Sequence, residues 1–243
     1  AREAFLYLIS FIALYITAFS FGALVFAFIS KAFPDPLHFS GFSSRGLTTS
    51  LAALIIAFPL YLFMARLIGK AAAKDPERRQ SKVGKWLTYL TLVIAAGIII
   101  GDLITVLSSL LGGELTTRFT LKAFTILVIA GSIFGYYLWS LQREEREKDE
   151  KNAAAKQKPV GVRIFIGAVV TSIALAVVYG LTLVGTPASQ RLIQFDERRV
   201  SDLRNIVFAI DSYWEQHEAL PEQLEDLKDS RYYIQSIADP GTG

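Results

Sequence analysis

Five long apolar stretches run through this chain, at residues 5–30, 47–65, 86–111, 119–141 and 164–184. A helix rises about 1.5 Å per residue, so about 20 apolar residues cross the roughly 30 Å hydrocarbon core of a bilayer. Each stretch meets or nearly meets that length. The pattern therefore predicts an all-α fold, a polytopic membrane bundle of five transmembrane helices, with the lipid bilayer as its surroundings.

Composition argues against several kinds of site. The 243 residues include no cysteine, so disulfides, thiolate metal sites and cysteine nucleophiles are excluded. The two histidines, His38 and His217, fall outside the apolar stretches, which leaves a bis-histidine haem in the membrane without ligands. No serine has a histidine base in reach, and no glycine-rich phosphate loop follows a strand. We expect no cofactor, no bound metal and no enzyme activity.

Basic residues are distributed unevenly over the connecting segments. Residues 66–85 and 143–163 contain seven each, whereas 31–46 and 112–122 contain two each. Cytoplasmic loops of membrane proteins carry an excess of lysine and arginine, so the pattern predicts a cytoplasmic N-terminus and an extracytoplasmic C-terminus. The basic clusters lie in loops beside the membrane rather than on one folded face, and we expect no nucleic-acid partner.

Four segments follow from this pattern. Residues 1–142 hold the first four predicted helices, and 143–163 form a charged cytoplasmic linker whose mixed-charge start should prolong the fourth helix. Residues 164–185 form the fifth membrane helix. Residues 186–243 contain six basic and eleven acidic residues, which predicts an acidic exported domain. No cleavable signal precedes the first stretch, so its helix is expected to remain in the protein.

The exported segment has the signals of a small helical hairpin. Thr186 can cap a helix whose first turn accommodates Pro187, and Leu220-Pro221 should end that helix. A short second helix would carry Leu224 and Leu227. Such a hairpin is too small for a large core and is expected to rest on a partner or on the membrane. The apolar residues on one side of the first helix are Leu203, Ile206, Val207, Ile210, Tyr213 and Trp214.

Asp102 is the one acidic residue within the five stretches. A carboxylate at the centre of a membrane helix costs about 2.5–3.5 kcal/mol, so Asp102 should face the bundle and be paired. Arg118 and Lys122, at the start of the fourth helix, are the expected partners in a structural ion pair. The alternative is a proton or cation site with Thr105 and Tyr136 as neighbours, against which stands the lack of a second intramembrane acid.

Two glycine pairs are candidate packing positions. Gly97 and Gly101 lie four residues apart in the third stretch, and Gly131 and Gly135 repeat the spacing in the fourth. Positions without side chains on one face allow another helix to approach closely. We expect them to mediate packing within the chain, with self-association as the alternative.

Several separated motifs in the first part resemble an uncharacterised bacterial family of membrane proteins, a domain of unknown function. They lie at residues 85–92, 100–104, 112–122 and 134–139, and residues 1–8 are similar to the start of that domain. The resemblance covers about residues 1–142. It implies a four-helix membrane domain and a bacterial source, and hence the bacterial cytoplasmic (inner) membrane, but no established activity.

The tail resembles the exported part of pilin-like and pseudopilin proteins. The similarity rests on Asp202-Leu203, Ala209-Ile210, Leu220-Pro221 and the terminal 239–243 segment. In those proteins a membrane helix runs into an amphipathic helix. Nothing before the fifth helix resembles the prepilin cleavage leader, so the resemblance implies the shape of the tail alone.

These observations favour a non-catalytic membrane protein, a structural, assembly or sensory subunit that presents the exported hairpin to an envelope protein or to a second copy. Exposed aromatic residues contribute strongly to interfaces. The contact candidates are Tyr213, Trp214, Tyr232 and Tyr233. The alternative function is an ion channel or proton-coupled transporter that uses Asp102.

Overall fold

The computed structural model describes residues 2–34, 44–74, 82–113, 115–149 and 160–228. Throughout these ranges the secondary structure is helical and no strand occurs. Five helices are long and apolar enough to span a membrane, which confirms the predicted fold class. They are α1 (Arg2–Ala32), α2 (Ser44–Lys74), α3 (Lys82–Leu111), α4 (Thr117–Asp149) and α5 (Val160–Val184).

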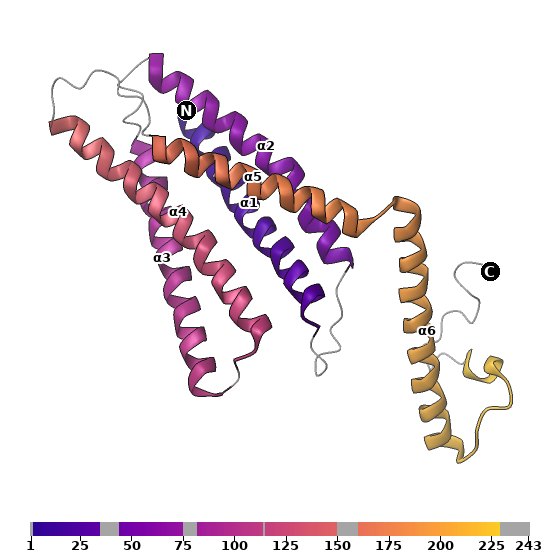
Figure 1. The fold of residues 1–243 in the computed structure, drawn as a ribbon. Helices are drawn as coiled ribbons and strands as arrows, with labels where there is room; N and C mark the ends of the chain where they lie inside the picture. Colours follow the sequence, from indigo (N-terminus) through magenta and orange to yellow (C-terminus); the bar gives the residue numbers. More distant parts are fainter. Residues whose placement is uncertain (1, 35–43, 75–81, 114, 150–159, 229–243) are drawn as a thin grey trace. The chain divides into compact units, whose positions relative to one another are not determined.

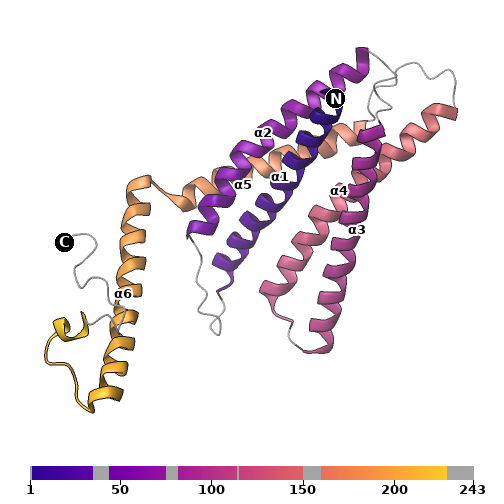
Figure 2. The same cartoon turned by 180° about the vertical axis from the view of Figure 1, so that it is seen from behind.

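Helix α1 is the centre of the membrane unit, because it contacts α2, α3 and α4. Figure 1 and the reverse view in Figure 2 show α1 beside α2 and α3 beside α4. The buried side chains are mostly aliphatic, and Leu24 of α1 and Leu54 of α2 are fully enclosed. Helix α2 continues through Pro59. Helix α4 continues to Asp149, so the mixed-charge run prolongs it as predicted.

Helix α5 packs against the same unit at both of its ends. Near its start, Phe165 lies parallel to Tyr136 of α4, with ring centroids 6.4 Å apart. Near its end, Tyr179 meets Phe28 of α1 edge-on at 4.7 Å. By its contacts the chain divides into two compact units between residues 183 and 184, so α5 falls in the same unit as the first four helices.

The second unit contains α6 (Pro187–His217) and the 3₁₀ helix η2 (Leu224–Lys228). Thr186 caps α6 as predicted: its hydroxyl oxygen accepts a hydrogen bond from the Ser189 backbone N–H at 3.2 Å, and Pro187 occupies the first turn. Glu218 ends the helix in the left-handed conformation, with its N–H donating to the Trp214 carbonyl. Helix η2 then returns to contact α6.

The four glycines of the paired motifs do not mediate close helix contacts in this structure. A Cβ atom built on Gly97, Gly101, Gly131 or Gly135 would meet no neighbouring atom within 4 Å. Each of these four positions thus has open space beside it, and the structure shows no close helix contact at the motifs. Close approaches occur instead at two glycines outside the motifs.

Gly84 and Gly180 are those two positions. A Cβ on Gly84 would lie 2.9 Å from the ring of Tyr7, and one on Gly180 would lie 3.0 Å from Leu51 Cδ1. Gly84 thus allows α1 to approach the start of α3, and Gly180 allows α5 to approach α2. Each small residue accommodates a large side chain from a neighbouring helix.

Replacing Gly84 with alanine is therefore expected to destabilise the membrane unit. The new methyl group would force the Tyr7 ring to move, and overpacking of this kind costs about 1–3 kcal/mol. Gly97→Ala is the matched control, because its methyl group enters open space in the same helix and alanine favours helix over glycine. Melting of the purified protein in detergent measures both. Equal melting temperatures for the two variants would contradict the expected contact.

Candidate functional site

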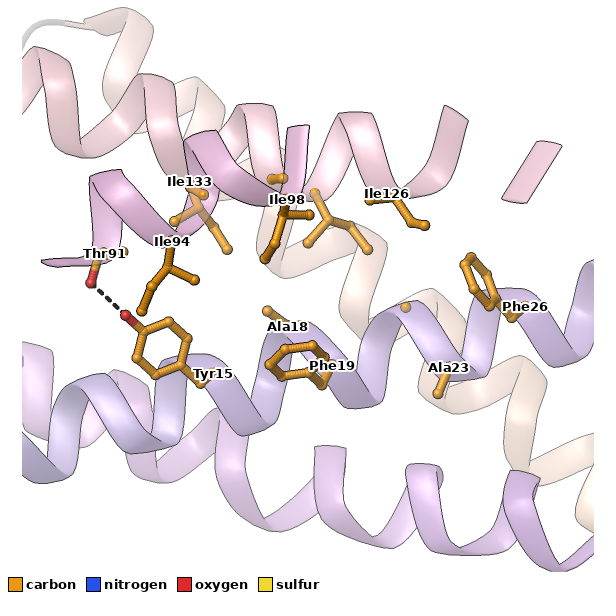
Figure 3. A pocket seen from close by; sticks show the side chains of 14 residues that line it. Tyr15, Ala18, Phe19, Ala23, Phe26, Thr91, Ile94, Ile98, Ile126 and Ile133 are labelled. Carbon is orange, nitrogen blue, oxygen red and sulfur yellow. Dashed lines mark hydrogen bonds between the residues drawn. The ribbon is translucent and has the colours of Figure 1, made fainter. Parts of the chain in front are cut away.

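A groove with a volume of about 410 Å³ lies between α1, α3 and α4 in the membrane unit. Figure 3 shows its aliphatic and aromatic side chains converging from the three helices. We call it the α1–α3–α4 groove. Its lining residues are Tyr15, Ala18, Phe19, Gly22, Ala23, Phe26, Thr91, Ile94, Ala95, Ile98, Ile126, Ile129, Ala130 and Ile133.

The groove arises from small residues on α1. Ala18 and Gly22 lie four residues apart and so share one helical face, and Ala23 adjoins them. Opposite them α4 contributes isoleucines; the Cβ of a side chain on Gly22 would sit 3.4 Å from Ile129 Cδ1. Short side chains on one helix facing branched side chains on the other leave an apolar space between the helices.

One end of the groove is closed by a hydrogen bond between α1 and α3. The Tyr15 hydroxyl lies 2.8 Å from Thr91 Oγ1, and the Thr91 hydroxyl also lies 2.8 Å from the Leu87 carbonyl (Figure 3). A threonine hydroxyl can donate only one hydrogen bond, and Thr91 donates it to the Leu87 carbonyl. The Tyr15 hydroxyl is therefore the donor to Thr91 Oγ1. Interhelical hydrogen bonds in membranes contribute about 0.6 kcal/mol on average, so this bond fixes geometry more than it adds stability.

Asp102 lies outside the lining of the groove but on the same face of α3, one helical turn beyond Ile98. Thr91, Ala95, Ile98 and Asp102 follow one another at steps of four, three and four residues, which places them on one helical face. The Asp102 side chain is buried, with 8% of the residue exposed. Its Oδ2 atom has no hydrogen-bond partner among the described residues. A buried acceptor in this state is costly and is satisfied when a donor binds.

The predicted ion pair does not appear among the contacts of the described residues. The Arg118 guanidinium donates from Nη2 to Ser30 Oγ at 3.2 Å, which ties the start of α4 to the end of α1. The Lys122 ammonium lies 5.4 Å above the Phe26 ring, a cation–π contact. Both basic residues therefore contact α1 and not Asp102, whose carboxylate is buried without either of them.

Thr105 and Tyr136 are not brought to Asp102. The Thr105 hydroxyl donates to the Gly101 carbonyl at 2.8 Å, on an exposed side of α3. Tyr136 belongs to an aromatic cluster near the other end of α4, where it contacts Tyr137 and Phe165. A second cavity of about 230 Å³ lies there, and its tyrosines are Tyr7, Tyr61, Tyr136 and Tyr137. Tyr136 thus has other neighbours than Asp102, and the Thr105 hydroxyl is bonded within its own helix.

The predicted partner contacts of the hairpin fall into two groups. Tyr213 packs against the small core of Ala209 and Leu227 and stacks on the His217 ring at 4.2 Å. Trp214, its neighbour in sequence, is exposed. Tyr232 and Tyr233 lie outside the described residues. No cluster of three or more potential metal ligands occurs within the described ranges.

Sequence reasoning identified Asp102, Arg118 and Lys122 but not the groove beside them. Tyr15 and Thr91 were not singled out as a pair, because their contact depends on how α1 and α3 are rotated toward each other. The Ala18, Gly22 and Ala23 cluster was the available signal. Its small side chains mark a face of α1 that leaves room for a neighbour.

The fold and the groove define a polytopic α-helical membrane protein. Residues 3–137 match the family described as Domain of unknown function (DUF5671), and the chain belongs to that family. The match confirms the resemblance of the first part to an uncharacterised domain and extends from α1 into α4; the bacterial source and the pilin-like tail stay predictions. No curated protein and no solved structure matches the chain.

Proposed function

We propose that this membrane protein is a non-catalytic subunit of the bacterial cytoplasmic membrane that presents its exported hairpin to an envelope protein partner. Its role would be structural, in assembly, or sensory. The observation that carries the proposal is a row of exposed apolar side chains along α6. Large exposed apolar surfaces in an aqueous compartment mark interaction sites.

Helix α6 has two apolar sides with different surroundings. Ile206, Ile210 and Tyr213 pack against Ala209 and Leu227, which forms the hairpin's own small core. The other side carries an exposed row at intervals of seven residues, and each of its members is between 39% and 56% exposed. A seven-residue apolar repeat is the pattern by which one helix docks on another. The members of this exposed row are Ile193, Val200, Val207 and Trp214.

Orientation is supported by the distribution of charge. The segments 66–85 and 143–163 hold seven basic residues each, on the side of the membrane assigned to the cytoplasm. With five crossings, α6 would then lie in the opposite compartment. There the exposed row would meet other envelope proteins rather than cytoplasmic ones.

Serine substitution of Val200, Val207 and Trp214 together is expected to reduce recovery of a partner by at least about tenfold, because aromatic and aliphatic anchors that become buried contribute most of an interface's energy. Recovery is measured by crosslinking in intact membranes, solubilisation and mass spectrometry, which also distinguishes a second copy from another protein. The matched control replaces three exposed polar residues of α6, Arg191, Asp211 and Glu215, with serine. Undiminished recovery in the apolar variant would overturn the proposal.

A channel or proton-coupled transporter is the second candidate, favoured by the buried, unpartnered Oδ2 of Asp102. In this case the membrane unit with Asp102 would be required for function and the hairpin would not. An ion flux in reconstituted vesicles that Asp102→Asn abolishes, and that deletion of residues 186–243 leaves intact, would replace the first proposal with this one.

A further inference from the structure

We propose that the α1–α3–α4 groove binds a single-chain phospholipid. Its acyl chain would lie along the groove, its phosphate between Arg118 and Lys122, and its free glycerol hydroxyl on Asp102. This site belongs to the membrane unit alone and is independent of the partner proposed for the hairpin.

The groove suits one hydrocarbon chain. Its volume of about 410 Å³ falls within the range of small-molecule pockets, about 300–1,000 Å³. Its walls are isoleucine, alanine and phenylalanine from three helices, and the Tyr15–Thr91 hydrogen bond closes one end. A chain entering from the other end, beside Phe26, would therefore stop at this bond.

The open end carries two cations that no described carboxylate neutralises. Lys122 lies over the ring of Phe26 at the rim of the groove, and Arg118 contacts the hydroxyl of Ser30, about one helical turn further along α1. Arginine binds phosphate through paired, charge-assisted hydrogen bonds, and lysine adds a point charge. A phosphate bound at the ends of these side chains would sit at the membrane surface, above the apolar groove.

Asp102 determines which chemical group of the lipid lies between its phosphate and its acyl chain. Helices α3 and α4 are consecutive and joined by a short turn, so Asp102 lies opposite about position 126 of α4. It is therefore about one helical turn, or roughly 5 Å, deeper in the membrane than Lys122. That is the depth of the glycerol unit of a lipid whose phosphate is at the rim. The unpartnered Oδ2 needs a donor, and a monoacyl glycerolipid has a hydroxyl there, whereas a diacyl lipid has an ester.

Three probes with the same choline headgroup separate these features. Lysophosphatidylcholine has the hydroxyl, hexadecylphosphocholine has one chain without it, and dipalmitoyl phosphatidylcholine has two esters. Binding to the full-length chain in maltoside detergent is measured by native mass spectrometry. We expect lysophosphatidylcholine to bind about tenfold more tightly than the other two, as for a hydrogen bond to a charged group. Equal binding of all three would overturn the role of Asp102.

Variants then test each part of the site. Asp102→Leu should abolish the preference for lysophosphatidylcholine, and Arg118→Gln with Lys122→Gln should weaken all three probes about equally. Lys70→Gln, an exposed cation at the end of α2, is the control for charge and should change nothing. A preference that persists in Asp102→Leu would overturn the assignment.

Filling the groove is the steric test. Ala23→Phe places a ring within the groove and should reduce binding of every probe at least about tenfold, whereas Ala52→Phe on the exposed side of α2 should not. Melting temperatures of both variants show whether each is folded. Unchanged binding in a folded Ala23→Phe protein would exclude the groove as the lipid site. If that variant does not fold, the three probes on the unmodified chain still test whether the site prefers lysophosphatidylcholine.

Discussion

A membrane-impermeant maleimide should label Thr116→Cys and Ser212→Cys in intact cells and leave Lys70→Cys unlabelled until the membrane is opened. Thr116, between α3 and α4, and Lys70, at the end of α2, are exposed, and Ser212 on α6 is partly exposed. The chain has no cysteine of its own, so each variant reports one site. The expected difference is all-or-none because an impermeant reagent does not cross the bilayer.

The physical reason is the cost of moving charge across the membrane. Two segments hold seven basic residues each, which should retain them on the cytoplasmic side, whereas the other two segments hold two each and should be exported. Labelling after permeabilisation is the control for reactivity. Thr116 and Ser212 are separated by two crossings, α4 and α5, so they share a compartment only if α5 spans. Labelling of Thr116→Cys but not of Ser212→Cys would show that the hairpin is not exported, and it would contradict the proposed function.

The five membrane helices and the start of α6 were predictable because their causes are local. An apolar stretch of the right length has few alternatives to a membrane helix, since its backbone must be hydrogen-bonded internally. Thr186 followed by Pro187 similarly defines a helix start within one turn, and the structure places the cap there. Neither prediction requires knowing what the helix packs against.

The contacts between helices were not predictable in the same way. The glycine motifs indicate which faces of α3 and α4 are smooth, but the faces that meet a neighbour depend on packing over the whole unit. Gly84 and Gly180, which belong to no motif, make the close approaches. Asp102 was correctly expected to be buried, yet its partner could not be read from the sequence because Arg118 and Lys122 turn toward Ser30 and Phe26 of α1.

Leu227→Asp is expected to abolish the docking of η2 on α6. Leu227 is 0% exposed and packs with Ala209, and together these two residues form the buried core that the second unit shows in its described part. Truncation of a buried leucine to alanine alone costs about 2–5 kcal/mol, and an unpaired carboxylate adds its desolvation. A core of this size has no other large buried side chain to compensate. Amide hydrogen exchange of residues 224–228 in the full-length protein measures the loss.

Leu224→Asp is the matched control, because Leu224 lies in the same 3₁₀ turn but is 42% exposed. Its charge can remain in water, and protection of the turn should persist. Retained protection in Leu227→Asp would mean that the pairing of α6 and η2 does not depend on this core. The same variant also separates the two sides of α6. The exposed row lies on a neighbouring side of α6 and is not part of the core with η2. Partner recovery should therefore survive Leu227→Asp if α6 itself is the docking element, and fail if the partner binds the folded hairpin.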